Sequence, residues 1–268
     1  MRWLVLALAA IFSAPLTAQP KPTAPPAIKL WQIDCGYLDE NQEKTWPWQQ
    51  VATPCPCFLI AHANRYMLWD AGISARAMTM NNPRYKLART ISDQLKDLGV
   101  KPAQIEFVGI SHFHGDHTGQ ASQFPQATLL IGAGDLGVLK TDPPPRGAAP
   151  PHIKPWLDGT SKVEALTEDH DVFGDGTVTI LRTPGHTPGH SALLVKLKTG
   201  PIILAGDLWF AHSDVLRGTM PEFNHSRAET IASRDRISRM AEALDATVII
   251  QHEPADLAKL PAFPKPLE

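Results

Sequence analysis

The segment His112-Phe-His-Gly-Asp-His117 places three imidazoles and a carboxylate within six residues. It follows residues 105–111, an apolar run typical of a buried strand. Imidazole nitrogen and carboxylate oxygen are ligands for zinc and other borderline divalent metals. Because four such groups on one loop would repel one another and resist desolvation, we expect a cation between them rather than an ordinary polar loop.

The size and charge of the chain limit the classes to consider. Its 268 residues, 43 % of them hydrophobic, suffice for a well-buried core in one or two domains. The net charge is −2, and the 25 Lys and Arg residues are dispersed rather than gathered in a basic stripe. We therefore expect no nucleic-acid partner.

The N-terminus has the pattern of a secretory signal. Arg2 precedes an apolar run over residues 3–12, which is too short to span a bilayer, and residues 13–18 are small enough for cleavage after Ala18. An uncleaved anchor or a buried N-terminal helix is the alternative. We predict a signal peptide at 1–18, a Pro-rich tether at 19–27 and a single domain at 28–268. The mature protein would be periplasmic or secreted, without a stable membrane anchor.

Export would place the three cysteines in an oxidising compartment. Cys35 lies at the end of one predicted strand, and Cys55 and Cys57 lie at the start of another. A bridge from Cys35 to either of the other two would close a short loop, and three buried thiols are the alternative.

The rest of the chain alternates strands with helices, which predicts a single α/β layered domain. A helix is expected at 84–98, and a second runs to about Leu244 from a capping box at Ser226–Glu229. The apolar face of the second helix would carry Ile231, Ile237, Met240 and Leu244. Residues 140–156 contain six prolines and are predicted to be irregular, near the surface or the mouth of a site. The tail from residue 261 is predicted to pack loosely. Strands are predicted at 28–34, 57–61, 66–70, 105–111, 128–132, 177–182, 202–205 and 247–251.

Three more polar residues stand where predicted strands end. His186 lies in the tight loop Thr-Pro-Gly-His-Thr-Pro-Gly-His at residues 183–190, Asp207 ends Leu-Ala-Gly-Asp, and His252 follows Val-Ile-Ile-Gln. Each alone is weak, since an Asp after a strand is most often a cap or turn residue.

Taken with the first motif, these residues resemble the ligand signature of the metallo-β-lactamase superfamily, His-x-His-x-Asp-His followed by His, Asp and His. The resemblance extends over about residues 28–260. It implies an αββα sandwich, in which two mixed β-sheets face each other with helices outside.

The resemblance also implies a site for two divalent metal ions, zinc above all, with cobalt, manganese or iron as alternatives. The first ion would be held by His112, His114 and His186, the second by Asp116, His117 and His252, and both by Asp207. The two ions would share a hydroxide that attacks the substrate, and Asp116 would orient it and protonate the leaving oxygen.

Asp207 and its surroundings resemble one branch of the superfamily, the exported N-acyl-homoserine lactonases. The strings at 111–119, 183–195 and 251–256 carry this likeness. It implies hydrolytic opening of a lactone ring. Many lactonases have a Tyr three residues after the bridging Asp, where this chain has Phe210, which cannot donate a hydrogen bond. His212 or the metals alone would then act on the lactone carbonyl.

An acyl tail requires an apolar wall, and several residues in loops near predicted strand ends could supply one, although ordinary packing would explain each singly. These candidates, with His212, are Trp46, Trp48, Trp209, Phe210, Met220 and Phe223. His190 is a candidate for supporting a metal ligand.

Other functions remain open for the same residues. The site could serve a phosphotriesterase or arylesterase, another ester or thioester hydrolase, or a weak β-lactamase. A metal-binding or partner-binding protein without activity is the non-enzymatic alternative, which the complete ligand set disfavours.

Overall fold

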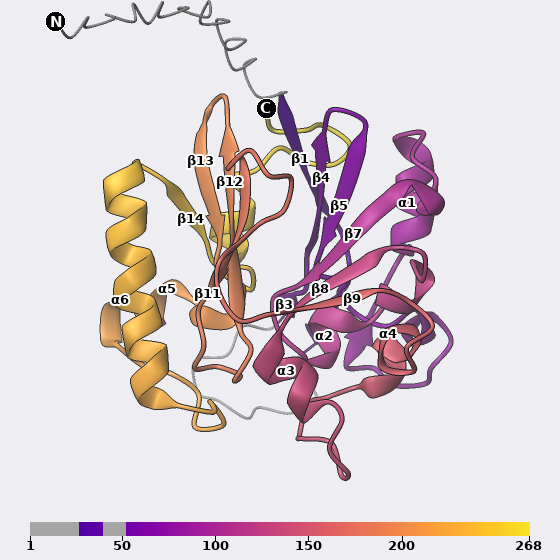
Figure 1. Cartoon of the computed structure of the whole chain (residues 1–268), viewed down its shortest axis with the longest axis horizontal. Helices are drawn as coiled ribbons and strands as arrows, with labels where there is room; N and C mark the ends of the chain where they lie inside the picture. The colour runs from indigo at the N-terminus through magenta and orange to yellow at the C-terminus, as the bar shows by residue number, and fades with distance from the viewer. Residues whose placement is uncertain (1–26, 40–51) are drawn as a thin grey trace, which may run out of the picture.

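Two β-sheets face each other in the computed structural model, which describes residues 27–39 and 52–268 (Figure 1). The strand order is β1-β4-β5-β7-β8-β9 in one sheet and β10-β11-β12-β13-β14 in the other. Helices cover the outer faces of both, with α1 and α4 on one side and α6 on the other. This is the αββα sandwich predicted from the sequence. The predicted signal peptide lies outside the described residues.

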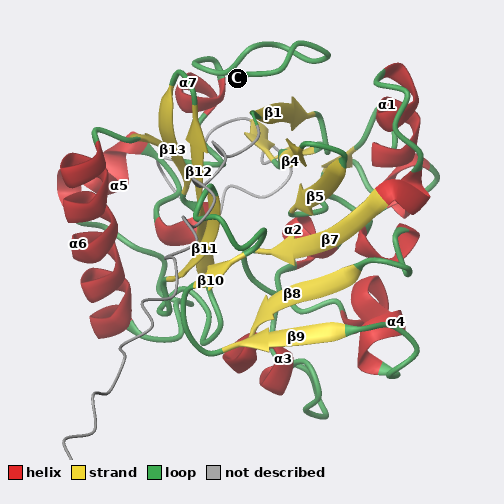
Figure 2. Ribbon diagram, turned by 45° about the horizontal axis from the view of Figure 1, so that its top comes forward, coloured by secondary structure: helices red, strands yellow, loops and turns green. Residues whose placement is uncertain are grey.

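The first sheet has an antiparallel edge and a parallel body. The pairs β1–β4 and β4–β5 are antiparallel, whereas β5, β7, β8 and β9 run parallel (Figure 2). Parallel neighbours need crossover connections, and these carry α1, α3 and α4. The strands are β1 Ile28–Ile33, β4 Cys57–His62, β5 Arg65–Trp69, β7 Ile105–Ile110, β8 Thr128–Gly132 and β9 Val163–Leu166.

The second sheet is formed by the later half of the chain. Its strands are β10 His170–Asp171, β11 Val178–Arg182, β12 Ser191–Leu197, β13 Gly200–Leu204 and β14 Thr247–Ile249. Only β13 and β14 pair in parallel, and α6 connects them. The strand β12 was not predicted from the sequence, although its apolar run Ala-Leu-Leu-Val stands at its centre.

Alternation along the strands builds three apolar layers. In β4, Phe58 and Ile60 face the second sheet, while Leu59 between them packs toward the helices outside the first sheet. In β12, Leu193 faces inward and Leu194 faces α6. Both faces of each sheet are buried, which explains why these strands are nearly continuously apolar.

Apart from α6, with 18 residues, the remaining elements are short. The α-helices are α1 Ile91–Asp97, α2 Gly115–Thr118, α3 Ala133–Val138, α4 Lys154–Leu157, α5 His212–Arg217, α6 Arg227–Leu244 and α7 Pro254–Leu257. The 3-10 helices are η2 Ala75–Met78, η3 Pro102–Gln104, η4 Ala121–Gln123, η5 Pro150–Ile153 and η6 Gly206–Leu208. A small third sheet joins β3 Ala52–Pro54, β2 Tyr37–Asp39 and β6 Tyr85–Lys86. None of the described helices is both long and apolar enough to cross a membrane.

A disulfide joins Cys35 to Cys57 and leaves Cys55 outside the bridge, buried. One of the two pairings predicted from the sequence is therefore present, and the prediction of three buried thiols is wrong.

Two helix predictions are corrected by the structure. The helix expected at 84–98 begins only at Ile91, because Thr90 caps it by accepting a hydrogen bond from the Asp93 amide at 3.1 Å. The preceding residues 85 and 86 form β6 instead. In α6, Ile231 and Leu244 are 52 % and 38 % exposed, so they are not on its buried face.

The C-terminal tail is not loosely packed. Leu267 and Leu30 exchange both backbone hydrogen bonds, at 2.8 and 2.9 Å, and Trp31 Nε1 donates to the Pro264 carbonyl. The tail thus covers the edge of β1 that β4 does not pair with.

Candidate metal centre

The predicted ligands come from loops at the ends of four strands. His112 and His114 follow β7, and Asp116 and His117 lie on the short helix α2 just beyond. His186 follows β11, while η6 after β13 and the turn after β14 carry the other two, Asp207 and His252. Both sheets therefore contribute to one cluster, which the structure assembles from all seven residues.

Three imidazoles and one carboxylate oxygen form a first group. His114 Nδ1 is 2.9 Å from His112 Nε2 and 3.0 Å from His186 Nε2. Asp207 Oδ2 is 3.6 Å from His112 Nε2 and 3.4 Å from His186 Nε2. These four ligand atoms all lie within 4.8 Å of one another.

The other oxygen of Asp207 faces a second group. Asp207 Oδ1 is 3.1 Å from His117 Nε2 and 3.0 Å from His252 Nε2. Asp116 Oδ2 is 3.7 and 3.8 Å from the same two nitrogens. Asp207 therefore stands between the two groups and presents one oxygen to each.

The orientation of the rings shows that these atoms fit a cation. His117 Nδ1 donates to Asp70 Oδ2 at 3.0 Å, and His252 Nδ1 donates to the Pro54 carbonyl at 2.7 Å. When such a ring is neutral, the opposite nitrogen is an acceptor, and each Nε2 then turns a lone pair toward Asp207. Among the described residues, Asp207 Oδ1 is buried without a hydrogen bond of good geometry. Acceptors facing acceptors at this range require a cation or protons between them.

The electrostatics of the cluster agree with this arrangement. Burial lowers the pKa of His112 well below its ordinary value and that of His186 to about 4, so both rings are neutral and could bind a metal ion. Burial alone would lower the pKa of His117 and His252. The negative charges of Asp207 and Asp116 outweigh this effect, so the pKa of both histidines is raised above the ordinary value. Burial opposes the ionisation of Asp207, yet His252, His117 and His112 keep its pKa well below the ordinary value. Protons held by His117 and His252 would be displaced by a bound cation.

Several residues that orient the ligands were not predicted from the sequence. Asp70 binds His117 and also accepts from the Ser111 amide and from Gln251 Nε2. Asn224 Oδ1 accepts from His186 Nδ1 at 2.9 Å. The only sequence signal for Asp70 was its position at the end of a predicted strand.

Asp135, at the start of α3, connects the two loops that carry the first group. Its carboxylate accepts hydrogen bonds from the Phe113 amide, the Gly189 amide and Thr187 Oγ1. Phe113 lies between two ligands, and Thr187 follows a third, so one buried carboxylate fixes both loops.

His190 supports Asp207 rather than a metal. Its Nε2 accepts from the Asp207 amide at 3.0 Å, and its Nδ1 donates to the Thr183 carbonyl at 3.0 Å. Burial lowers the pKa of His190 to about 3, which keeps Nε2 an acceptor.

Of the seven residues proposed to line a substrate pocket, two lie at the cluster. Phe210 stacks on His252 at 5.5 Å between ring centroids, and Phe223 lies 5.7 Å from His186 and 6.2 Å from His114. Trp209 instead packs in the core beside Ile237, under α6. Met220 is half-buried and His212 Nε2 contacts Asp256 Oδ1 at 2.8 Å, while Trp46 and Trp48 lie outside the described residues.

The proline-rich segment 140–156 borders the cluster, which is one of the two positions predicted from the sequence. The prediction that it is irregular is wrong for its second half, where η5 and α4 form. Ala148 pairs with His114 in an isolated bridge, and the Gly147 carbonyl accepts from the Gly115 amide at 3.0 Å. Gly147 has a φ of +84°, and a Cβ there would lie 2.6 Å from the His114 ring. Glycine is therefore required for this close approach.

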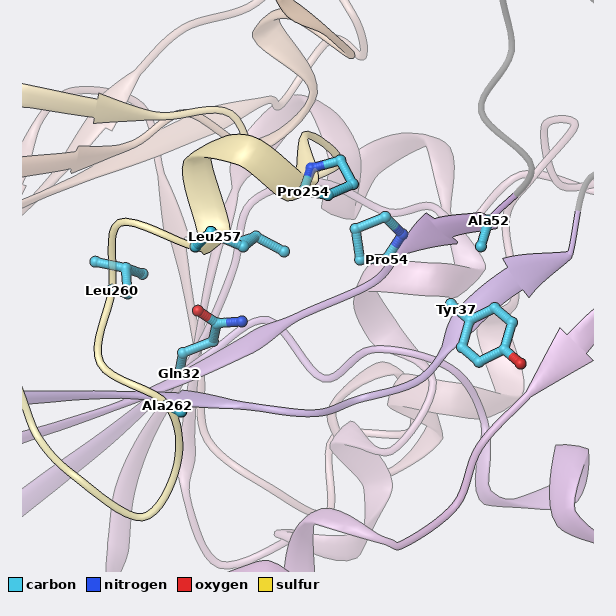
Figure 3. A pocket seen from close by; sticks show the side chains of 9 residues that line it. Gln32, Tyr37, Ala52, Pro54, Pro254, Leu257, Leu260 and Ala262 are labelled. Carbon is cyan, nitrogen blue, oxygen red and sulfur yellow. The ribbon is translucent and has the colours of Figure 1, made fainter.

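An apolar pocket of about 690 Å³ is lined in part by Pro54, whose carbonyl accepts from His252 Nδ1 (Figure 3). Its lining includes Pro54, Pro254, Leu257 and Leu260. Because Pro54 contacts the Nδ1 side of the His252 ring and Asp207 contacts the Nε2 side, this pocket is separate from the metal cluster.

Comparison with known proteins agrees with the geometry. Residues 51–252 match the model of the metallo-beta-lactamase superfamily. The N-acyl homoserine lactonase AttM of Rhizobium radiobacter is 33 % identical over 230 residues, covering 78 % of this chain and 87 % of the relative. A lactonase of the same name from Azorhizobium caulinodans is 31 % identical over 75 % of this chain and 82 % of its own.

Solved structures show the same fold. An N-acyl homoserine lactone hydrolase with N-hexanoyl-L-homoserine at its catalytic metal centre has a TM-score of 0.75 and 18 % identity, covering 90 % of this chain and 100 % of its own. A quorum-quenching N-acyl homoserine lactone lactonase has a TM-score of 0.76 and 20 % identity, covering 91 % and 100 %.

Proposed function

This chain belongs to the metallo-beta-lactamase superfamily and is a metal-dependent hydrolase, and on that premise we propose that it opens the lactone ring of N-acyl-homoserine lactones with two divalent ions, zinc above all. The relatives that share a third of its residues over most of its length are named for that reaction. The reaction adds water across the ring ester and yields a carboxylate and a hydroxyl on an N-acyl-homoserine.

The observation that carries the two-metal proposal is the position of Asp207. Its two oxygens face different groups of ligand atoms, at 3.4–3.6 Å in the first and 3.0–3.1 Å in the second. A single ion could bind only one of these two groups. The lone pairs of the other group would then face one another without a cation. When bound, two such ions lower the pKa of water and polarise a carbonyl.

We propose that Asp116 is the residue that moves a proton. Its carboxylate belongs to the second group, yet its side chain is 20 % exposed, unlike those of Asp207 and His117 at 3 % and 2 %. One oxygen can thus face the substrate. We propose that it orients the attacking water, takes up its proton and passes it to the ring oxygen as the C–O bond breaks.

Phe210 and Phe223 would form the apolar wall beside the lactone. Their rings lie 6.3 Å apart, and each contacts His186, with Phe210 also stacked on His252. Phe210 offers no hydrogen bond to the lactone carbonyl. Phe223 is 49 % exposed, which suits a residue that an acyl tail covers on binding.

A hydrolysis panel tests the substrate. Purified mature protein is assayed on acyl-homoserine lactones of several tail lengths, a thioester, a β-lactam and an aryl phosphotriester. The lactones should have the highest kcat/KM, and the inactive variant His114→Ala serves as the control for contaminating activity. A large preference for any other class would contradict the lactonase proposal.

We also propose that the protein is exported, on the basis of the signal-like pattern at residues 1–18. N-terminal sequencing of the protein from periplasmic and extracellular fractions should find a chain that begins at or near Gln19. Recovery of the uncut chain from the cytoplasm would contradict export.

A further inference from the structure

Cys55 lies next to the second group of ligand atoms. Its Sγ, a carboxylate oxygen of Asp116 and a ring nitrogen of His252 all lie within 4.8 Å of one another. Cys55 Sγ is 4.0 Å from Asp116 Oδ2 and 3.6 Å from the Thr53 carbonyl, and the residue is 1 % exposed. The ligand signature read from the sequence contains no cysteine.

We propose that the Cys55 thiolate is a further protein ligand of the second metal ion. The proposal rests on the two-metal centre proposed above, and it assigns a ligand that the resemblance to the superfamily does not supply. The second ion would then be held by Asp116, His117, His252 and Cys55, with Asp207 shared between the two ions.

The backbone around Cys55 is attached to the site on both sides. The Pro54 carbonyl accepts from His252 Nδ1 at 2.7 Å, so the preceding residue orients one of the proposed ligands. The Cys55 amide donates to the Gly36 carbonyl at 2.8 Å, and Cys57 is held by its disulfide to Cys35. The thiol is therefore kept in place by the fold and does not depend on a flexible loop.

A second observation points to a cation in the same place. Asp207 Oδ1 is buried without a well-formed hydrogen bond among the described residues, and it faces His252 Nε2 at 3.0 Å. His252 thus belongs both to the group with Asp207 and to the group with Cys55. Two ligand atoms bound to the same zinc ion at 2.0–2.3 Å lie at most about 4.5 Å apart, whatever the coordination geometry. The 4.0 Å between Cys55 Sγ and Asp116 Oδ2 is within that limit, so both atoms can bind one ion.

A thiolate ligand would make the two sites chemically different. The first group offers only imidazole nitrogens and a carboxylate oxygen, whereas the second would include a soft sulfur. Soft ligands favour zinc and cobalt over manganese or magnesium. The thiol would lose its proton on binding, as thiols do when they coordinate zinc.

Cobalt spectroscopy tests the assignment without any substrate. The metal-stripped mature protein, with its disulfide intact, is titrated with Co²⁺. The wild type should develop a sulfur-to-cobalt charge-transfer band in the near ultraviolet, because Cys35 and Cys57 are oxidised and only Cys55 can supply a thiolate. Cys55→Ser should bind cobalt and keep the visible bands of nitrogen and oxygen ligands while losing the charge-transfer band.

Two further measurements keep the test decisive if the variant folds poorly. X-ray absorption of the zinc-loaded wild type should show sulfur at about 2.3 Å. His252→Ala, which removes another proposed ligand of the same ion, should lose the charge-transfer band while keeping Cys55. Binding of two cobalt ions without a charge-transfer band and without a sulfur shell would refute the Cys55 proposal and leave the lactonase proposal standing. If the charge-transfer band is present but the hydrolysis panel shows no preference for lactones, the lactonase proposal is refuted and the Cys55 proposal stands.

Discussion

At the residue scale, the position of Asp207 depends on its immediate neighbours. Its backbone amide is fixed by His190, and the preceding Gly206 has a φ of +56°, where a Cβ would lie 2.7 Å from His190 Nε2. Glycine at this position therefore allows His190 to approach and the carboxylate to stand between the two ligand groups. Buried at 3 % exposure, the charge of Asp207 is balanced by histidines and, as we propose, by two cations.

Asp207→Asn should reduce the metal content from about two ions per chain to about one, because the neutral amide cannot bridge two cations. Lactone hydrolysis should fall by about a hundredfold or more, since changes to residues that merely support metal ligands already cost 10–100-fold. Metal analysis and kcat/KM check both results. Asp169→Asn, which removes a surface carboxylate paired with Arg236, is the matched control and should change neither. Full metal content in Asp207→Asn would remove the bridging role.

Asp135 predicts a specific dependence of stability on pH. Burial raises its pKa to about 6 against the hydrogen bonds from Thr187, Gly189 and Phe113. Because the folded pKa exceeds the unfolded value of about 4, the folded protein binds this proton more tightly. The stability contributed by the protonated carboxyl is fully present below pH 4 and is lost as the pH rises through 6. Two pKa units correspond to about 3 kcal/mol.

The measurement compares the unfolding free energy of metal-free wild type with that of Asp135→Asn between pH 4 and 8. The difference, wild type minus variant, should decrease as the pH rises and level off above about pH 7. The subtraction removes the contribution of the histidines, which both proteins share. A difference that stays flat or increases would mean that the three donors keep the carboxylate ionised.

The seven ligand candidates could be found from the sequence because together they resemble the ligand signature of a known superfamily, although only those at residues 112–117 are neighbours in the chain. The residues that orient them could not, because their roles depend on which nitrogen of each ring faces inward. Asp70 and Asn224 each bind the outer nitrogen of a histidine far away in sequence. Trp209 was placed in the pocket for its size, yet its ring points into the core next to Arg234.

At the scale of elements, α6 shows why a helix could be located but not oriented from its sequence. Ser226 caps it by accepting from the Glu229 amide at 3.2 Å, which is one half of the predicted capping box, whereas the Ser226 amide donates to the Gly185 carbonyl. Its buried face, however, carries polar residues that bind backbone carbonyls: Ser233 Oγ donates to Pro184, and Arg234 Nε donates to Leu208. Apolar periodicity alone cannot identify a face of this kind.

A matched pair of substitutions in α6 tests the observed face. Ile237→Ala should lower the unfolding free energy by about 2–5 kcal/mol, because Ile237 is fully buried against the second sheet. Ile231→Ala, at a half-exposed position, should change it by about 0.5 kcal/mol or less. Chemical denaturation at one pH gives both values. Equal losses of unfolding free energy at the two positions would indicate that Ile231 is buried, as predicted from the sequence.

At the scale of the whole molecule, the candidate metal centre joins the two sheets. His112, His114, Asp116 and His117 follow a strand of the first sheet, whereas His186, Asp207 and His252 follow strands of the second. The layers could be predicted because the ligand signature resembles that of a superfamily whose fold is known. The tail that covers β1 could not, since a pairing between Leu30 and Leu267 depends on segments far apart in the chain.

Removal of the metals should therefore destabilise the entire fold and not merely the site. An ion that binds only the folded chain, and whose free concentration is a thousand times its dissociation constant, stabilises the fold by about 4 kcal/mol. For a chain of this size, this corresponds to an increase of roughly 10 °C in Tm. Thermal unfolding in excess chelator and in excess zinc should differ by at least this amount. In Asp207→Asn, which we expect to hold fewer ions, this difference in Tm should be smaller. In Asp169→Asn it should equal that of the wild type. Identical melting of the wild type in chelator and zinc would show that no cation links the two sheets, whatever the activity of the protein.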